Sequence, residues 1–515
     1  MSESLREAFQ SVVERHGDAP AIILPDRDPL SYATLSDGCG ALAATLATRG
    51  VGKGDRVALY CPNCPEFAVA YLGIVTAGAV VVPCNLLLSH EELAYILNDS
   101  AATALIVHPQ LAAAGRQLMA SVASLRLCIS TGNAEDGALA WSDVLASRQV
   151  PIALPPLTSE DLAAILYTSG TTGRPKGAML SHGNLLANTR SVHSAMHWRP
   201  GDDVVLVVLP MFHAFAATVG LLTPLTCGCA LVPVPKFDPD QVARVIEATG
   251  ATIFLGVPSM FTMFLKLKEG RRSGLRSLRF CVSGGAALPV AVLAQFEGMF
   301  GIPVYEGDGP TECSPVTCVN PIGGKAKPGT VGLPVPGVEM RILDEDGHEL
   351  PDGEVGEIAV RGANVFKGYW NLPDETAASF SGSWFLTGDL GMRDEDGYFS
   401  IVDRKKDLII VNGMNVYPRM IEEVVHRLPQ VREVAVVGQP HRLHGETPAA
   451  FVALHEPGSL TEAAIRDWCR QHLGRHQVPR EIEIVAALPR NAAGKILKRE
   501  LRRDGEVERG FERPD

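Results

Sequence analysis

The feature that most constrains the fold is an alternation of short apolar runs with helix-like stretches, which continues from the N-terminus to about Val402. The runs ATALIVH, DVVLVVL, ATIFLGV and LRFCVSG have the length of buried strands, while PDQVARVIEATG and PVAVLAQFEGMF have the pattern of helices. Such alternation is typical of layered α/β proteins. We therefore predict an α/β fold class for this part of the chain.

The sequence changes character twice toward the C-terminus. Past Lys327, turns rich in Gly, Pro and Asp separate short strands, which indicates a β-rich subdomain. After the charged segment DRKKD, which begins at Asp403, a compact α+β tail is expected. A chain of 515 residues is too long for one compact core. We predict a large N-terminal domain, residues 1–402, and a small C-terminal domain, residues 403–515.

Composition narrows the expected partners and location. The formal net charge is −12 and no long basic block occurs, which disfavours nucleic acid as a partner. The eleven cysteines are scattered, and the N-terminal stretch MSESLREAFQSV has charges but no apolar core of a secretory leader. Reduced thiols fit this pattern best, so we expect a cytoplasmic location.

Two long stretches, residues 67–89 and 204–235, contain no Asp, Glu, Lys or Arg. Each exceeds the roughly 20 residues that a membrane-spanning helix needs. Glycines and prolines interrupt both stretches, however, which indicates alternating helices and strands of a buried core. We predict no membrane span.

The stretch YTSGTTGRPKG, residues 167–177, combines glycines, hydroxyls and a lysine directly after the apolar run LAAIL. The run predicts a buried strand, and Ser181 is placed to cap a following helix, so we expect a loop between a strand and a helix. Glycines let consecutive N–H groups point to one place, and hydroxyls with a lysine add further donors, as a phosphate site requires. The spacing is not that of a Walker loop. A flexible surface turn is the alternative.

Further motifs follow in order along the chain: GDGPTE (307–312), TGD (387–389), DRKKDLIIVNGMNVYP (403–418) and NAAGKILKRE (491–500). Together with TSGTTGRPKG they resemble the AMP-forming, adenylate-forming superfamily, which includes acyl-CoA synthetases, luciferases and peptide-synthetase adenylation domains. Residues 55–85 are similar to the first subdomain of that superfamily. Within the superfamily, the sequence most resembles bacterial fatty acyl-CoA ligases.

The resemblance implies a two-step ligase that uses ATP, Mg²⁺ and coenzyme A. A carboxylic acid attacks the α-phosphate of ATP to give acyl-AMP and pyrophosphate, and the CoA thiol then displaces AMP. Because charge moves onto phosphate oxygens, the first step needs fixed positive charge and a metal more than it needs a base. A homodimer is compatible with the resemblance, although no residue pattern specifies the oligomeric state.

The motifs also imply which residues carry the chemistry. The catalytic candidates are Lys495, Glu312 and Thr168, with Glu312 as the Mg²⁺ ligand. Lys495 would reach between the acyl carboxylate and the α-phosphate, whereas Lys498 and Arg499 are expected on a solvated face. The implied ATP- and AMP-binding residues are Thr168, Ser169, Gly170, Thr171, Thr172, Gly173, Lys176, Gly284, Gly285, Ala286, Glu306, Gly307, Asp308, Thr311, Asp389, Arg404 and Lys495.

Two further sets of residues concern the acid and CoA. Asp403 matches the hinge residue about which the C-terminal domain of the family rotates between the two steps. The loop Val411, Asn412 and Gly413 would then line the CoA tunnel. The implied acyl-pocket residues are His213, Phe215, Gly220, Val257 and Gly285.

Two positions depart from the family pattern. Asp308 stands where relatives commonly have a tyrosine against the adenine ring, and an aspartate cannot stack there; Tyr305 is a nearby substitute. Met420 replaces an acid that often precedes Glu422. With Asp308 in this place, a non-catalytic nucleotide-binding relative remains an alternative function.

Four cysteines form close pairs in the sequence. Cys61 and Cys64 form C-x-x-C, which suits redox or metal chemistry, but no second pair at a metal-ligand spacing follows. Cys227 and Cys229 form C-x-C. Since the family usually has other residues at the first pair, packing substitutions are the preferred interpretation.

Two sequence features that other members of the superfamily have, and this chain lacks, narrow the substrate class. The stretch LPMFHAFAATVG has His213 and no acid to hold an amine, which disfavours an amino acid. No insertion precedes the TGD motif, which disfavours ligases that load carrier proteins. Small residues at 214, 216, 217, 220 and 287 leave room for an alkyl chain, although they also suit helix-to-sheet packing. We expect a medium- or long-chain fatty acid, with an aryl or short-chain acid as the alternative.

Overall fold

The structure is a computed structural model that describes residues 3–133, 137–147, 153–168, 174–441, 443–490 and 496–502. Its contacts divide the chain into two compact units. The first comprises Met1–Met340 and Ala359–Phe385, and the second Arg341–Ile358 and Leu386–Asp515. The expected boundary between residues 402 and 403 falls inside the second unit, so a hinge at Asp403 stays a prediction.

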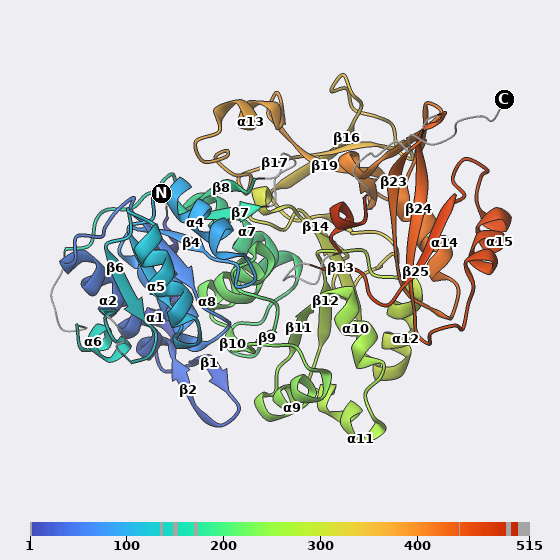
Figure 1. The fold of residues 1–515 in the computed structure, drawn as a ribbon. Coiled ribbons are helices and arrows are strands. Elements are labelled where there is room, and N and C mark those ends of the chain that lie inside the picture. The colour runs from blue at the N-terminus through green and yellow to red at the C-terminus, as the bar shows by residue number, and fades with distance from the viewer. Residues whose placement is uncertain are drawn as a thin grey trace. The chain divides into compact units, whose positions relative to one another are not determined.

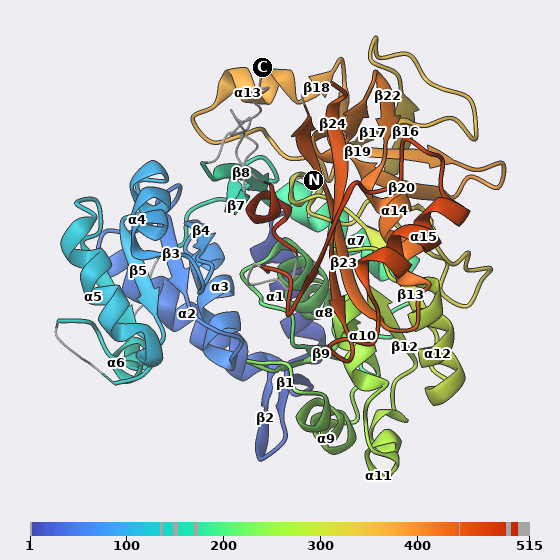
Figure 2. The ribbon, with the colours of Figure 1, turned by 45° about the vertical axis from the view of Figure 1, so that its right-hand side comes forward.

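A six-stranded sheet forms one layer of the first unit. Five of its strands are parallel, and β8 pairs antiparallel with β7 at one edge. Apolar residues of α4 (His90–Asp99) and α5 (Ala112–Ser121) cover one face, and Figure 2 shows α2 (Tyr32–Thr48) and α3 (Pro65–Thr76) on the other. The strand order is β6 (Leu127–Ser130), β5 (Ala104–Val107), β3 (Arg56–Tyr60), β4 (Val80–Pro83), β7 (Leu162–Thr168) and β8 (Lys176–Ser181).

A nine-stranded sheet forms the second layer of this unit (Figure 1). Its central strands, from β13 to β1, are parallel, whereas β2, β14 and β15 pair antiparallel. The strand order is β15 (Leu333–Pro334), β14 (Cys318–Val319), β13 (Val304–Asp308), β12 (Phe280–Ser283), β11 (Ile253–Gly256), β9 (Val204–Val207), β10 (Ala230–Pro233), β1 (Pro20–Leu24) and β2 (Arg27–Ser31).

The helices of the first unit begin and end at residues that the sequence marks. Ser181 caps α7 by accepting the N–H of Asn184, and α9 begins after Asp238 and ends at Gly250, whose φ of +65° suits glycine. The remaining helices are α1 (Leu5–His16), α6 (Trp141–Ala146), α7 (His182–Ala195), the π-helix Ala216–Leu222, α8 (Thr223–Cys227), α9 (Pro239–Thr249), α10 (Pro258–Phe264), α11 (Glu269–Arg272), α12 (Val290–Phe300) and α13 (Pro373–Ala378).

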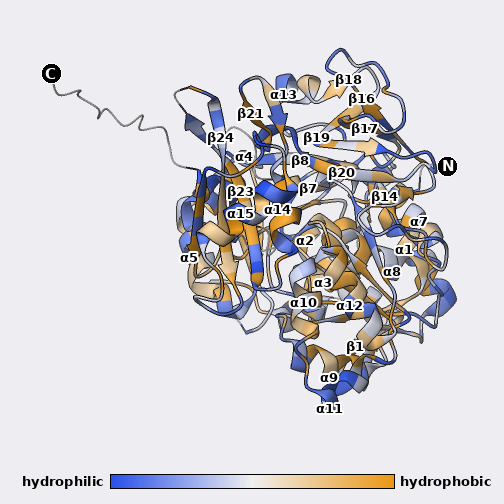
Figure 3. Ribbon diagram, turned by 90° about the vertical axis from the view of Figure 1, so that its right-hand side faces the viewer, coloured by the Kyte–Doolittle hydropathy of each residue, from blue (hydrophilic) through white to orange (hydrophobic). Residues whose placement is uncertain are grey.

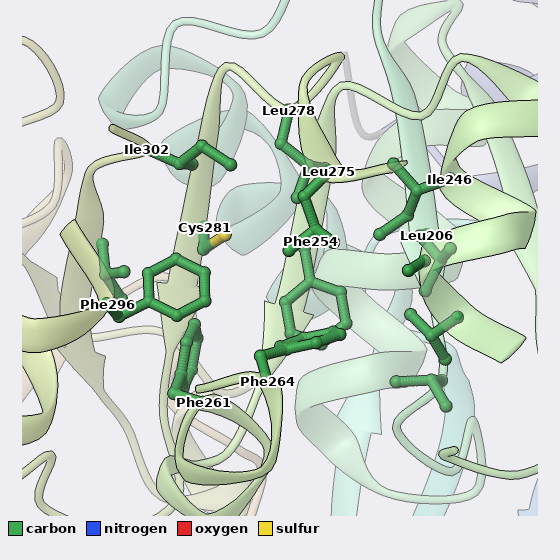
Figure 4. Close-up of a cluster of buried hydrophobic side chains, with 14 of the residues drawn as sticks. Leu206, Ile246, Phe254, Phe261, Phe264, Leu275, Leu278, Cys281, Phe296 and Ile302 are labelled. Carbon is green, nitrogen blue, oxygen red and sulfur yellow. The ribbon is translucent and has the colours of Figure 1, made fainter. Parts of the chain in front are cut away.

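A cluster of phenylalanines packs α10 and α12 against the nine-stranded sheet (Figure 4). Phe261 meets Phe254 and Phe296 edge-to-face, with ring centroids 5.9 and 5.2 Å apart. All three side chains are fully buried. Each contributes on the order of 2–3 kcal/mol through burial, so this cluster anchors the strands whose ends carry the predicted nucleotide site.

The later strands form two five-stranded sheets. The first has the order β16 (Val338–Leu343), β17 (Gly356–Gly362), β19 (Trp384–Arg393) and β18 (Phe380–Ser381), with β20 (Phe399–Arg404) also beside β19. The second lies within the second unit, with α14 (Pro418–His426) and α15 (Glu462–His472) in the same unit. Its order is β22 (Met414–Val416), β21 (Ile409–Val411), β24 (Gly445–Leu454) and β23 (Val431–His441), with β25 (Glu481–Val485) beside β24.

The distribution of hydrophobic and hydrophilic residues agrees with this arrangement of sheets and helices. Figure 3 shows hydrophobic residues concentrated on strands such as β23 and hydrophilic residues on the short helix α11. The charge-free stretches form α3 with β4, and β9 with the π-helix, α8 and β10, as the sequence predicted. Within the described residues, none of the helices has the length and apolar character needed to cross a membrane.

Candidate active site

The phosphate-binding motif does not connect a strand directly to a helix, so that expectation was wrong. Residues 176–181 form β8, which pairs antiparallel with β7, and Thr168 lies opposite Lys176. Pairing with β7 satisfies the backbone groups of this segment, which is why it is a strand before Ser181 caps α7. The predicted residues Ser169, Gly170, Thr171, Thr172 and Gly173 lie outside the described residues, as does Lys495.

The Lys176 ammonium is held by two residues that no motif indicated. It forms a close ion pair with Glu375 of α13, and its Nζ lies 5.4 Å from the ring centroid of Tyr369. Its side chain is 12% exposed. The cation is therefore fixed at the start of β8, and an incoming phosphate would exchange with a carboxylate that already neutralises it.

Tyr369 also holds Glu312. The tyrosine hydroxyl donates to Glu312 Oε1 at 2.8 Å, and the N–H of Phe366 donates to the Glu312 carbonyl at 2.7 Å. Burial first, and Glu312 second, raise the pKa of Tyr369 above its usual range, so the hydroxyl remains a donor. Glu312 thus has one carboxylate oxygen oriented by a neutral partner, in a half-buried place.

The predicted adenine strip follows β12. A Cβ at Gly284 would lie 3.2 Å from the Phe215 ring, so a larger residue would press against that ring. Gly285, with φ of +76°, and Ala286 are exposed. This brings the strip beside Phe215, a predicted acyl-pocket residue, and the predicted adenine and acyl sites are therefore neighbours.

The end of β13 carries the GDGPTE motif. Gly309 is required there because a Cβ would lie 1.7 Å from the Pro315 carbonyl oxygen. Asp308 is half-buried, and its carbonyl accepts the N–H of Thr317. Gly307 and Thr311 are also half-buried.

Two side chains of β13 point to other partners. The buried Glu306 accepts the N–H of Leu288 at 3.1 Å and so fixes the backbone just after the adenine strip. The hydroxyl of Tyr305 accepts the N–H of Gly323, and its ring packs against Phe280. These contacts fix the position of the Tyr305 side chain, and its role beside adenine stays a prediction.

The predicted acyl residues surround the π-helix and the end of β11. His213 Nε2 is buried and has no hydrogen-bond partner among the described residues, and burial lowers the pKa of His213 to about 4. A Cβ at Gly220 would lie 2.9 Å from Val207, so this glycine serves close packing on β9 and its absent side chain leaves no free space. By contrast, a Cβ at Gly285 would only reach Val257, at 3.9 Å.

In the second unit, sheet register brings Asp389 and Arg404 together. They lie opposite each other on β19 and β20, and Arg404 Nε is 2.8 Å from Asp389 Oδ1. Asp389 is buried while the Arg404 side chain is 41% exposed. The pair predicted to bind ribose is thus a preformed ion pair.

Asp403 is buried beside this pair. Its carboxylate accepts the N–H groups of Arg404, at 2.7 Å, and Arg419, at 2.8 Å. Burial raises its pKa, against the opposing effect of Lys498.

The expectation that Lys498 lies on a solvated face was wrong. Its Nζ pairs with Glu422 Oε1 at 2.8 Å, and the side chain is 21% exposed. Glu422 also accepts the N–H of Val436 at 2.7 Å. Burial opposes a charged lysine, but Glu422 and Asp403 together raise the pKa of Lys498. Arg499 is exposed, as expected.

The predicted CoA loop contains residues with left-handed backbone. Asn412 has φ of +51° and Gly413 of +79°, and both are exposed. Val411 and Asn412 line a cavity of about 220 Å³ together with Arg475, His476 and Arg480. This cavity combines a backbone turn with cationic side chains in one unit.

Comparisons with known proteins agree with these motifs. Residues 9–370 match the model for AMP-binding enzymes, and residues 420–495 match the model for the AMP-binding enzyme C-terminal domain. The long-chain-fatty-acid–CoA ligase of Bacillus subtilis is 35% identical, over 97% of this chain and 94% of the relative.

Two solved structures have the same fold. The ATP-bound MatB of Rhodopseudomonas palustris has a TM-score of 0.89 at 35% identity, covering 97% of this chain and 98% of the other. A benzoate CoA ligase from Burkholderia xenovorans has a TM-score of 0.88 at 28% identity, covering 97% and 100%.

The fold and the matched models define a class: the chain belongs to the AMP-binding enzyme family. Within this family it is an ATP-dependent acyl-CoA ligase, an AMP-forming acid–thiol ligase. The resemblance and the α/β fold class inferred from the sequence are confirmed.

Proposed function

We propose that the acid is a medium- or long-chain fatty acid, activated to acyl-AMP with release of pyrophosphate and then joined to CoA with release of AMP. The observation that carries this proposal is the uncharged lining expected for the acyl group. Phe215, Val257 and Gly285 are apolar, and the lowered pKa keeps His213 neutral near pH 7. Burying an unpaired charge is costly, so a second carboxylate or an amine on the acid would be rejected, whereas an alkyl chain would not.

The relatives support the same substrate class without restricting chain length. The B. subtilis relative is named for long-chain fatty acids. The benzoate ligase favours the second candidate, an aryl or short-chain acid, because its TM-score of 0.88 is nearly the same as the 0.89 of the ATP-bound MatB.

In the first step, we assign the triphosphate to Lys176 and the hydroxyl of Thr168, which face each other across the β7–β8 pair. Glu312 would hold Mg²⁺, and its hard carboxylate oxygens, one oriented by Tyr369, fit such an ion. The metal would reduce the negative charge of the triphosphate when bound. Lys495 would place its charge at the α-phosphate, where the acyl carboxylate attacks.

In the second unit, Asp389 would accept the ribose hydroxyls, with Arg404 holding its carboxylate in place. The cationic cavity beside Val411 and Asn412 suits the phosphates of CoA, since Arg475 and Arg480 line it. The predicted rotation about Asp403 would bring Val411, Asn412 and Gly413 to the acyl-AMP.

The test is pyrophosphate release over a panel of carboxylic acids, with and without CoA. We expect the highest kcat/KM for saturated acids of medium or long chain, and AMP release only with CoA. Val257→Trp should lower kcat/KM for long acids more than for short ones, while Val290→Trp, at an exposed valine of α12, should change neither. Highest kcat/KM with benzoate or a short acid would replace the proposed substrate by the second candidate.

A further inference from the structure

A turn that the ligase reaction does not use brings two thiols together. Cys227 ends α8, Gly228 follows with φ of +91°, and Cys229 leads into β10. The two Sγ atoms lie 3.5 Å apart. Cys227 is half-buried, whereas Cys229 is fully buried.

Hydrogen bonds hold this turn in place. The buried hydroxyl of Tyr32 donates to the carbonyls of Pro224, at 3.1 Å, and Cys229, at 2.7 Å. The N–H of Gly201 donates to the Gly228 carbonyl at 2.8 Å. The sulfurs are therefore kept near each other by their surroundings, and a further approach of about 1.5 Å would reach the roughly 2.0 Å of an S–S bond.

The two sulfurs are not equivalent. The Cys227 thiol donates to Cys229 Sγ, and the Cys229 thiol donates to the Arg199 carbonyl at 3.4 Å. The nearness of Cys229 and of His193 of α7 lowers the pKa of Cys227, whereas the contact with Cys227 and burial raise the pKa of Cys229. The same contact raises the pKa of His193. A thiolate beside an imidazolium is the arrangement that makes a cysteine nucleophilic.

We propose that Cys227 and Cys229 form a peroxide-sensitive modification site, in which Cys227 attacks and Cys229 resolves. The Cys227 sulfur attacks hydrogen peroxide, the O–O bond breaks, and the departing hydroxide takes a proton from His193 and leaves as water. The Cys229 sulfur then attacks the resulting sulfenic acid, the S–O bond breaks, and a second water leaves with the Cys229 proton. One disulfide forms, and one peroxide is reduced to two waters.

The same chain contains a matched control pair. Cys61 and Cys64 have their sulfurs 3.4 Å apart, and, as in the first pair, one thiol is fully buried (Cys61) and the other is half-buried (Cys64). A hydrogen bond with Cys64 and burial raise the pKa of Cys61, and its neighbours in this balance are Glu66 and Thr131, neither of them a cation. Proximity alone would oxidise both pairs, whereas the mechanism proposed here selects Cys227.

The experiment treats the reduced full-length protein with limiting hydrogen peroxide, alkylates the remaining thiols, and maps tryptic peptides without reduction. Trypsin does not cleave between Arg199 and Pro200, so the peptide runs from Ser191 to Lys236, and it contains Cys227 and Cys229 and no other cysteine. We expect this peptide to lose two hydrogens and to escape alkylation, while Cys61 and Cys64 stay reduced and become alkylated.

Two variants test the assigned roles. Cys229→Ser should stop at the sulfenic acid, which a 1,3-dione reagent captures on Cys227. His193→Gln should slow oxidation roughly tenfold at neutral pH, as expected when the thiolate fraction falls by that factor. Thermal melting checks that each variant is folded. The peptide map of the parent protein tests the disulfide even if a variant fails to fold. The proposal is overturned if Cys227 and Cys229 stay alkylated at peroxide doses that oxidise Cys61 and Cys64, or if a folded His193→Gln variant reacts at the parental rate.

Discussion

Replacing Tyr369 by phenylalanine removes one hydroxyl from the proposed metal site and nothing else. The hydroxyl donates to Glu312 Oε1 at 2.8 Å, and the ring lies below the Lys176 ammonium. Phenylalanine keeps the ring and therefore the cation–π contact. The variant separates the orientation of Glu312 from the placement of Lys176.

The expected magnitude follows from the type of hydrogen bond. A bond to a charged group is worth about 1.5–3 kcal/mol, which corresponds to roughly 10- to 150-fold in an equilibrium constant. Tyr369 is only half-buried, so water can replace part of the lost bond and the effect should fall near the lower limit. We expect the half-saturating Mg²⁺ concentration for acyl-AMP formation to rise about tenfold.

The assay is pyrophosphate exchange measured against Mg²⁺ at fixed ATP and acid. Tyr32→Phe is the matched control, because it removes a buried tyrosine hydroxyl in the same unit, with two carbonyl partners and no assigned role in the reaction. It should lower the melting temperature without changing the Mg²⁺ dependence. If Tyr369→Phe leaves the half-saturating Mg²⁺ unchanged, or lowers it, Glu312 does not hold the metal in the way proposed.

Three other changes test separate parts of the reaction, and a fourth tests how stability depends on pH. Lys495→Ala should abolish acyl-AMP formation but spare thioester formation from supplied acyl-AMP; equal loss of both, measured by product analysis, would refute its role at the α-phosphate. Asp308→Tyr should tighten ATP binding by up to about 0.5–1.5 kcal/mol in calorimetry if Asp308 flanks adenine, and weaker binding would show a different pocket. Asp403→Pro should retain pyrophosphate exchange and lose most CoA-dependent turnover, whereas Asp403→Ala, which removes the carboxylate without fixing φ, should lose less; parental thioester synthesis in the proline variant would place the hinge elsewhere. Burial lowers the pKa of His182 to about 4, so as the pH falls from 6.5 toward 4 the unfolded chain binds a proton that the folded chain does not. The free energy of unfolding should therefore fall by up to about 1.4 kcal/mol per pH unit in this window. His182→Gln should reduce this slope in urea titrations, and equal slopes in the variant and the parent would contradict the assignment.

Local signals in the sequence were sufficient for most elements. The helix α9 could be predicted because Asp238 caps its start and Gly250 ends it, and both signals lie within the helix's own neighbourhood. The buried strands of the parallel sheets could be predicted because both faces are covered and their residues are continuously apolar. These features depend on residues a few positions apart, which a sequence displays directly.

The contacts that complete the site depend on distant residues. Glu375 lies 199 positions from Lys176, and Tyr369 lies 57 positions from Glu312. Neither residue belongs to a motif, and a single tyrosine, or a glutamate in a short helix, carries no signal of its own. The strand β8 was missed for the same reason, since pairing with β7 decides it and its six residues alone do not.

The contacts of Asp403 restrict how a hinge at this residue could work. Rotation about ψ would move Arg419 away from the Asp403 carboxylate and break a 2.8 Å hydrogen bond at a buried group, which is costly. Rotation about φ carries the carboxylate with Arg419 and Lys498, so these contacts survive. It does separate Arg404, whose side chain is 41% exposed and can be solvated, from the buried Asp389, and it separates the Arg419 guanidinium from the Ile401 carbonyl. A swing about φ would thus release the ribose pair at the same moment as it withdraws the C-terminal residues, and φ is the angle that proline fixes.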